Sequence, residues 1–509
     1  MTALIIHGHF YQPPRENPWT GVVEVEPSAA PFHDWNERIH SECYRPNAAA
    51  RIADPATGHE RIVNNYANIS FNFGPTLLSW LKTNHPETYG WIIAADQQSA
   101  GQRAGHGNAI AQAYGHAILP LCNERDRQTQ ILWGLADFRA RFERDAEAMW
   151  LPETACNDEV MGALIDAGLR FVILAPNQAD RVRVFGESDW RAVNEHGVDT
   201  SLAYRYSHRD GSSRSMAVFF YDGPTSRAIA FENLLRSSSE LVNRFAQTTH
   251  GRELVNIATD GETYGHHFKF GDICLAHALD LEAPARGFQI TNYGEYLDRH
   301  PAEWEVEINN GPDGEGTSWS CAHGVARWIR DCGCHTGGEP GWSQRWRTPL
   351  RQAFDFLRDE NAVHFAATRG NLFVDPWQTR DDSIDLVLDQ HHSREEFLQD
   401  HAGRWLSTDE QWRALTYLEM QRMLVLMYTS CGWFFNDISG IETIQILKYA
   451  ARAIDLMDQL GLPSVRERFS EILAEAKSNV TEMATGADIY RRIVEPVRQS
   501  RRDQEVLVT

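Results

Sequence analysis

Two acidic residues stand where apolar runs end, and together they could form a catalytic pair. Glu153 follows the run Ala146 to Leu151, and Asp260 follows the run Leu254 to Thr259. A carboxylate at the end of an apolar strand is costly to desolvate unless it has a partner or a task. Two carboxylates that face one mouth can divide into a nucleophile and a proton donor, which is the division that glycoside hydrolysis requires.

The distance between the two carboxylates would decide the stereochemistry. A separation of about 5 to 5.5 Å gives retention at the anomeric carbon, whereas about 6.5 to 9.5 Å leaves room for a water and gives inversion. Spacing in the sequence does not fix this distance. For either carboxylate alone, a helix cap or an ion-pair partner is the alternative, but two in equivalent positions beside aromatic residues favour catalysis.

Histidines offer a competing chemistry. His7 and His9 follow an apolar run, and with His106, His116, His266 and His267 they could hold a divalent cation, as in metal-dependent sugar hydrolases. Neutral histidines serve equally well as hydrogen-bonding partners of sugar hydroxyls. We favour the second interpretation and expect neither a metal nor a cofactor.

A second group of possible ligands is Cys321, His323, Cys332, Cys334 and His335, in a Gly-rich and Trp-rich segment. A Cys-x-Cys spacing fits no familiar zinc finger, so the sequence favours reduced thiols over a structural zinc. A loop this long and aromatic is more often functional than passive, and we expect it to contribute to a cleft.

The elements that must position these residues follow an alternating pattern up to about residue 300. Short apolar runs predict strands, and amphipathic segments between them predict helices. Seven such units predict a barrel of parallel strands with reactive residues at the strand ends. The predicted strands are Ala3 to His7, Ile69 to Phe73, Ala146 to Leu151, Phe171 to Leu174, Ala217 to Tyr221, Leu254 to Thr259 and Phe288 to Thr291.

After about residue 345 only helices are predicted, because apolar residues recur at three- and four-residue spacing. These segments are Leu350 to Asp359, Asp409 to Tyr428, Ile441 to Leu460 and Val465 to Ala476. The fold class is therefore α/β, with a (β/α)7-type barrel followed by a C-terminal α-helical bundle domain. We predict a catalytic barrel over residues 1–305, a Gly/Trp-rich loop over 306–345, and the helical domain over 346–509.

The overall charge limits the partners. With 48 Lys and Arg against 70 Asp and Glu, the formal charge is 48 − 70 = −22. Such a surface repels nucleic acid and anionic lipid, so neither is expected as a partner. The N-terminus has no basic region before its short apolar run, the eight cysteines show no disulfide framework, and no segment is long and apolar enough to span a bilayer. These features predict a cytoplasmic protein; they give no oligomeric state.

Four motifs resemble those of glycoside hydrolase family 57, over roughly residues 1 to 330. They are His7-x-His9 followed by Gln12-Pro13, then Gly105-His106-Gly107-Asn108, then Trp150-Leu151-Pro152-Glu153, and then Thr259-Asp260-Gly261-Glu262-x-Tyr264-Gly265. The chain departs from the family pattern at Asn108, where a Glu is usual. The helical half resembles an extension of unknown function in one branch of the family.

The resemblance implies a (β/α)7 barrel that acts on α-glucan or maltooligosaccharide with retention and without a metal. It implies that Glu153 is the nucleophile and Asp260 the general acid/base. The residues expected to contact the sugar are His7, His9, Gln12, His106, Trp150, Tyr264, His266, Trp319 and Trp433. Amylase-type hydrolysis, 4-α-glucanotransferase activity and α-1,4-glucan branching all stay open. A non-catalytic glucan-binding protein is the alternative of another class.

Overall fold

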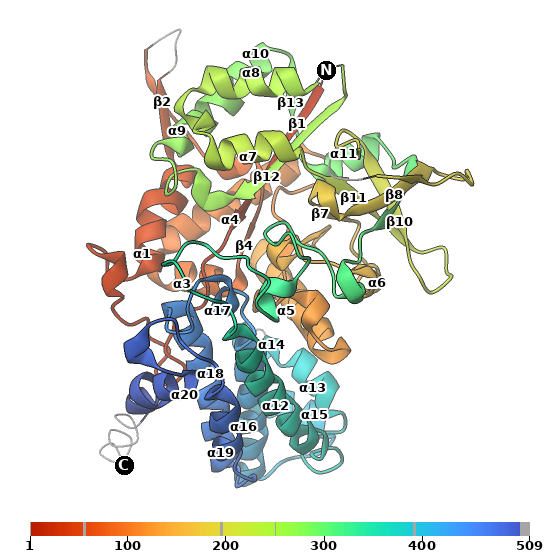
Figure 1. Cartoon of the computed structure of the whole chain (residues 1–509). Helices are drawn as coiled ribbons and strands as arrows, with labels where there is room; N and C mark the ends of the chain where they lie inside the picture. Colours follow the sequence, from red (N-terminus) through yellow and green to blue (C-terminus); the bar gives the residue numbers. More distant parts are fainter. Residues whose placement is uncertain (1, 54–57, 194–196, 250, 390–392, 499–509) are drawn as a thin grey trace.

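The structure is a computed structural model that describes residues 2–53, 58–193, 197–249, 251–389 and 393–498. In Figure 1 the barrel occupies the upper part of the molecule and the C-terminal helices the lower part. Residues 499–509 of the predicted helical domain lie outside the described residues.

A ring of parallel strands forms the barrel. Strand β1 (Thr2–Phe10) pairs with β12 (Leu254–Asp260) on one side and with β4 (Ser70–Phe73) on the other. The ring continues through β5 (Ala111–Gln112), β6 (Met149–Trp150), β7 (Phe171–Leu174) and β11 (Ser215–Phe220). It closes where the Asp222 amide, just after β11, donates to the Asn256 carbonyl of β12 at 2.8 Å. These seven described strands confirm the predicted (β/α)7 barrel.

One predicted barrel strand is assigned wrongly. The run Phe288 to Thr291 forms β13 (Phe288–Ile290), which pairs only with the first residues of β1. The seventh member of the ring is instead β5, which has two residues and was not predicted. A strand this short shows no alternation or apolar run, so its pairing with β6 is visible only in three dimensions.

Helices surround the barrel, and their ends follow local capping rules. The Asn157 side chain accepts a hydrogen bond from the Val160 amide and caps the start of α6 (Asp158–Asp166). Asn123 caps α5 (Glu124–Phe142) in the same way. The other helices of this half are α1 (Trp35–Ile39), α2 (Arg45–Ala48), α3 (Pro75–Asn84), α4 (Pro86–Gln102), α7 (Gly223–Phe231), α8 (Ser238–Thr249), α9 (Gly271–His277), α10 (Ala283–Ala285) and α11 (Tyr293–Arg299).

A side sheet extends from the barrel at β11. Strand β10 (Ala203–Ser207) pairs antiparallel with β11, and β14 (Trp304–Ile308), β8 (Ala179–Val184) and β9 (Arg191–Ala192) follow outward. Figure 1 shows this sheet to the right of the barrel. On the other side, β2 (Ala50–Ala53) and β3 (Glu60–Val63) form a small hairpin.

The C-terminal half is helical, as predicted. Its main helices are α12 (Arg347–Ala366), α16 (Thr408–Leu426), α18 (Ile441–Gln459) and α19 (Arg466–Leu473), and α16 packs against α18 while α12 packs against α19. Shorter helices complete it: α13 (Pro376–Asp382), α14 (Ile384–Val387), α15 (Arg394–Ala402), α17 (Cys431–Phe434) and α20 (Gly486–Ile489). No helix among the described residues is long and apolar enough to cross a membrane.

The two halves share one hydrophobic core. Tyr114, Ile118 and Trp133 of the first half are buried in the same apolar cluster as the helices of the second half. Trp133 lies on α5, and its indole N–H donates to the Asp381 carbonyl at 2.9 Å. The helical half is therefore packed against the barrel and not connected to it by a linker alone.

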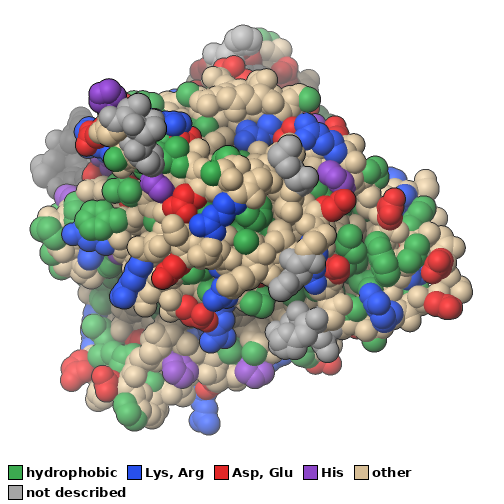
Figure 2. Space-filling model, turned by 90° about the horizontal axis from the view of Figure 1, so that it is seen from above, with side chains coloured by type: hydrophobic (Ala, Val, Ile, Leu, Met, Phe, Trp, Pro, Cys, Tyr) green, Lys and Arg blue, Asp and Glu red, His purple; other side chains and the backbone are tan. Residues whose placement is uncertain are grey.

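On the face that Figure 2 shows, Lys and Arg side chains are interspersed with Asp and Glu.

Candidate active site

The two predicted carboxylates lie at the C-terminal ends of barrel strands. Asp260 is the last residue of β12, and its Cα faces that of His9 on β1. Glu153 follows β6 after Leu151 and Pro152, in a left-handed backbone conformation with φ 58° and ψ 22°. Such a conformation is uncommon for a residue with a side chain and is often found at functional sites.

The Gly/Trp-rich loop over residues 306–345 holds the Glu153 carboxylate through hydrogen bonds. One carboxylate oxygen accepts a hydrogen bond from the Trp319 indole N–H at 3.1 Å and another from the Ser320 hydroxyl at 2.6 Å. The Trp319 amide also donates to the Glu153 carbonyl at 3.1 Å, and Cys156 forms a backbone bridge with Thr317. The loop therefore pairs with the segment that carries Glu153 and fixes the orientation of its carboxylate.

The surroundings of the two carboxyl groups act differently on their pKa values. Burial raises the pKa of Glu153, and the hydrogen bonds from Ser320 and Trp319 oppose this rise. The Asp260 side chain reaches solvent, but the protein packed around it and then the charge of Glu153 raise its pKa to about 7. Asp260 therefore holds a proton in a pH range in which a hydrogen-bonded Glu153 can be ionised.

A third carboxyl group lies behind Asp260. Glu262 is buried, and its Oε1 accepts hydrogen bonds from the Tyr44 hydroxyl at 2.8 Å and the Tyr11 amide at 3.2 Å. Burial and then the charge of Asp260 raise the pKa of Glu262 to about 8.

Gly261, between Asp260 and Glu262, lies against the Phe10 ring, and an added Cβ would come within 2.3 Å of that ring. The Asp-Gly-Glu motif thus requires glycine in order to pack on β1.

His7 and His9 form a neutral hydrogen-bonded group on β1. His7 lies 3.0 Å from the Ser70 hydroxyl and 3.1 Å from Asn72 Oδ1, and His9 Nδ1 also contacts Asn72. The Asn72 amide in turn donates to Gln112 at the end of β5, at 2.8 Å. Burial lowers the pKa of both histidines to about 3. His7 is fully buried and both of its ring nitrogens are engaged, which corrects its predicted sugar contact and leaves His9, 5% exposed, as the neutral imidazole that could exchange hydrogen bonds with a sugar hydroxyl.

Aromatic rings join this group to Glu153. The Trp150 ring stacks on His7 at 4.6 Å and on His9 at 5.2 Å, and its edge meets Trp319 at 5.2 Å. Trp150 is only 1% exposed, and its indole N–H has no partner among the described residues. Trp150 therefore packs against the two histidines and is not accessible to a sugar, which corrects its predicted contact, whereas the partly exposed Trp319 offers a surface on which a sugar ring could stack.

Five residues near the carboxylates were not predicted as site residues: Asn72, Gln112, Tyr221, Ser320 and Ser430. Tyr221 follows β11, and its pKa is raised by burial and then by the nearby charge of Asp260. Asn72 had a detectable signal, because it is a polar residue inside the apolar run Ile69 to Phe73. Ser430 had none, because it lies in the helical half, far from the barrel motifs in sequence.

His106 is not at the site, which corrects the prediction. Its ring contacts the Glu147 and Asp298 carboxylates at 3.0 Å, and Arg170 pairs with the same two acids. Glu147 precedes β6 and Arg170 precedes β7, so this cluster closes the N-terminal end of the barrel. Asn108 lies at the same end, where its side chain donates to the Tyr66 carbonyl. Its difference from the family pattern therefore lies away from the carboxylates.

Tyr264 and Trp433 are buried in packing roles, which also corrects the prediction. Tyr264 is inaccessible in the barrel core, and its hydroxyl accepts a hydrogen bond from Thr259 at 3.1 Å. Trp433 is 1% exposed and packs among Phe354 and Tyr428 of the helical half. Neither ring is accessible to a sugar in this structure.

Gln12 and His266, which were also predicted to contact the sugar, each have a polar partner within the protein. Gln12 accepts a hydrogen bond from Arg15 at 2.9 Å, and His266 lies 2.5 Å from Glu42 beside Trp35. Both side chains are partly exposed. Their contact with a sugar stays a prediction.

Two sets of possible metal ligands stand out among the described residues, with donor atoms within 4.8 Å of one another. One is Cys321, His323, Cys332 and Cys334, and the other is Glu37, His40 and His85; neither contains His7 or His9.

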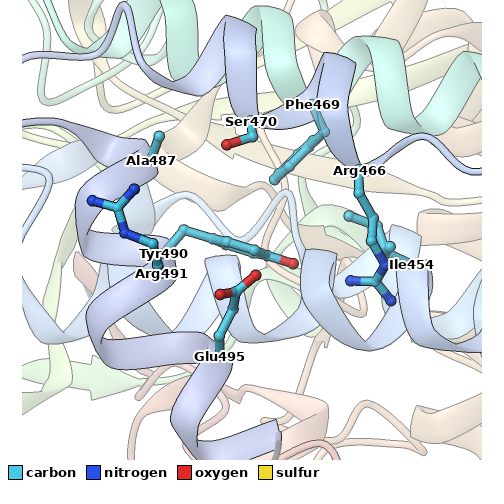
Figure 3. Close-up of a pocket in the computed structure, with 8 residues that line it drawn as sticks. All are labelled: Ile454, Arg466, Phe469, Ser470, Ala487, Tyr490, Arg491 and Glu495. Carbon is cyan, nitrogen blue, oxygen red and sulfur yellow. The ribbon is translucent and has the colours of Figure 1, made fainter.

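A cavity of about 90 Å³ in the helical half, shown in Figure 3, is lined by Arg466, Phe469 and Tyr490. It is lined by none of the predicted site residues.

Comparison with known proteins places this geometry in context. The model of the glycosyl hydrolase family 57 matches residues 3–309, and that of a domain of unknown function, DUF3536, matches residues 342–504. No curated protein matches the chain.

Several solved structures share the fold. A novel exo-type maltose-forming amylase from Pyrococcus sp. ST04 is 16% identical, with 93% of this chain and 82% of that one covered and a TM-score of 0.68. A GH57-type branching enzyme from Pyrococcus horikoshii is 14% identical, with 96% of each chain covered and a TM-score of 0.54. A 4-alpha-glucanotransferase from Thermococcus litoralis is 14% identical, with 89% and 58% covered and a TM-score of 0.50.

Proposed function

Since the chain belongs to glycosyl hydrolase family 57, we propose that it is a retaining enzyme acting on α-1,4-linked glucan through a covalent glycosyl-enzyme intermediate. The observation that carries the proposal is the unequal state of the two carboxyl groups. Glu153 is oriented by two hydrogen-bond donors, while Asp260 has its pKa raised to about 7. This is the division between nucleophile and proton donor that the reaction needs.

The proposed reaction has two steps. A Glu153 carboxylate oxygen attacks the anomeric carbon, the glycosidic bond breaks, and Asp260 gives its proton to the leaving oxygen. Asp260, now a carboxylate, then takes a proton from the acceptor hydroxyl, which attacks the same carbon and releases Glu153. Proton transfer by a positioned side chain contributes about 10² to 10⁴ in rate. Water as acceptor gives hydrolysis, and a sugar hydroxyl gives transfer or branching.

A neutral sugar polymer fits the surroundings of the carboxylates. His7 and His9 are uncharged, and Trp319 is the partly exposed aromatic residue beside Glu153. Aromatic faces cover the C–H side of a pyranose, while imidazoles exchange hydrogen bonds with its hydroxyls. The structural relatives named above include an amylase, a glucanotransferase and a branching enzyme, which supports α-glucan as the substrate class.

Product analysis tests the substrate. The protein is incubated with maltoheptaose and with amylose, and the products are separated by chain length and linkage. Shorter maltodextrins alone indicate hydrolysis, a ladder that includes longer chains indicates transfer, and new α-1,6 linkages indicate branching. Unchanged α-glucans in all assays would contradict the assignment.

Two variants test the mechanism. Glu153→Gln and Asp260→Asn are expected to abolish turnover while glucan binding is kept, whereas a binding protein would show no turnover to lose. The anomer formed first, followed by proton NMR, reports retention or inversion. Initial release of the inverted anomer would exclude Glu153 as a nucleophile that forms an ester.

A further inference from the structure

The loop that holds Glu153 also brings together four metal-binding side chains. The Cys321 sulfur lies 3.9 Å from that of Cys332 and 3.8 Å from that of Cys334, and the Cys334 sulfur lies 3.4 Å from His323 Nδ1. All four donor atoms are within 4.8 Å of one another. Two residue pairs with a single residue between them, Cys321-x-His323 and Cys332-x-Cys334, thus converge across the turn at Ala326–Trp328.

We propose that Cys321, His323, Cys332 and Cys334 form a structural zinc site. Two sulfurs bound to one tetrahedral zinc, each at about 2.3 Å, lie about 3.8 Å apart. The observed sulfur separations match this value and are far longer than the about 2.05 Å of a disulfide. Three thiolates and one imidazole complete four-coordination, which is the closed ligand set of structural zinc sites.

The charges around the cluster support a bound metal. Arg347 is fully buried and donates to backbone carbonyls, including that of Cys334 at 3.0 Å, and Arg327 is buried over the Phe434 ring. Neither guanidinium forms an ion pair within the part of the chain that the structure describes, and Arg327 Nε and one terminal nitrogen have no hydrogen-bond partner there. Glu153 acts electrostatically on Arg327, and Asp331 acts on Arg347, but neither carboxylate lies within ion-pair distance, and a buried charge normally has a closer counter-charge.

A zinc ion bound by three thiolates and a neutral imidazole would carry a net charge of −1 (2 − 3) and so supply that counter-charge. Binding releases the three thiol protons to solvent.

The position of the site suggests what the metal stabilises. Cys321 directly follows Trp319 and Ser320, whose side chains hold the Glu153 carboxylate. A metal at Cys321 would fix one end of this segment, while its backbone pairing with Cys156 fixes the other. The link to turnover rests on the proposed function, whereas metal binding itself does not.

Metal analysis of the full-length protein tests the site directly. Protein produced with added zinc and purified without chelator is expected to contain about one zinc per chain. The double variant Cys332→Ser/Cys334→Ser is expected to lose it. Cys122→Ser is the matched control and should keep the metal, because that thiol donates to the Ile118 carbonyl outside the cluster. A wild type that stays metal-free after zinc addition would overturn the proposal, and so would a double variant that keeps its zinc.

A second pair of variants guards against misfolding. His323→Ala should weaken zinc binding, whereas His323→Cys should restore it as a four-cysteine site. Cobalt substitution of the wild type should give the sulfur charge-transfer absorption of a tetrahedral thiolate site. Zinc lost from His85→Ala instead would assign the metal to Glu37, His40 and His85 and overturn the proposal. A disulfide between Cys321 and Cys332 in freshly purified protein would overturn it as well.

Discussion

Glu153 and Asp260 differ in what surrounds them, and this difference predicts the pH dependence of turnover. Glu153 must be ionised to attack, so the rate should fall as the pH decreases through its raised pKa. Asp260 must be protonated to act first as an acid, so the rate should fall as the pH rises through about 7. We expect a bell-shaped profile of kcat/KM whose alkaline limb lies near pH 7. A profile that is flat from pH 6 to 9 would contradict the role of Asp260.

The Ser320 hydroxyl should affect one limb of that profile. Ser320→Ala removes the 2.6 Å hydrogen bond to the Glu153 carboxylate, which stabilises its ionised form. A hydrogen bond to a charged group is worth about 1.5–3 kcal/mol, so on the acid side of the profile kcat/KM should fall about 10- to 150-fold. The acid limb should move to higher pH, because the pKa of Glu153 rises further. Ser318→Ala is the control, since its hydroxyl donates to the Gly324 carbonyl and should leave that limb in place.

At the scale of the elements, the candidate site residues lie at strand ends, and a residue of the helical half contacts one of their neighbours. His116 follows β5 and stacks on Tyr11 at 3.7 Å between ring centroids. Its Nε2 lies 3.3 Å from His9, and its Nδ1 lies 2.7 Å from the Ser430 hydroxyl just before α17. The Ser430 amide also donates to the His116 carbonyl. A helical-domain residue therefore reaches His9, which we propose as a sugar contact, through the imidazole of His116.

This contact predicts an effect on binding that is separate from the chemistry. Ser430→Ala should free the His116 ring and, through it, His9, at a cost of about 0.5–1.5 kcal/mol. We expect KM for maltoheptaose to rise up to about tenfold with kcat and the pH limbs unchanged. Ser439→Ala serves as the control, because within the described part of the chain only its backbone amide forms a hydrogen bond, with Asp437. Equal KM values for the two variants would show that Ser430 has no positioning role.

The sequence predicted most strands, and the position of Glu153 and Asp260 at strand ends, because apolar runs and the residues that follow them are local patterns. It failed where position depends on distant segments. His106 follows no apolar run, so nothing in its neighbourhood indicates which end of the barrel it occupies. Trp433 was expected to contact the sugar, yet it is buried against Tyr428 and against Phe354, which lies far from it in sequence. The Cys-x-Cys spacing likewise gave no indication that four possible metal ligands lie close together in the folded chain.

For the whole molecule, the shared core predicts that the barrel and the helices unfold together. Trp133 extends from α5 of the barrel into the apolar cluster of the helical half, where it is fully buried and bonded to the Asp381 carbonyl. Trp133→Ala should lower the free energy of unfolding by about 3–5 kcal/mol, as expected for a buried tryptophan replaced by a cavity. Trp405→Ala is the control, because its ring is 67% exposed and the change should cost little. Urea unfolding followed both by circular dichroism and by turnover should give one coincident transition, shifted to lower urea only for Trp133→Ala. If circular dichroism lost its helical signal at a urea concentration where turnover persisted, the two halves would be independent, and the influence of Ser430 on His9 would need another route.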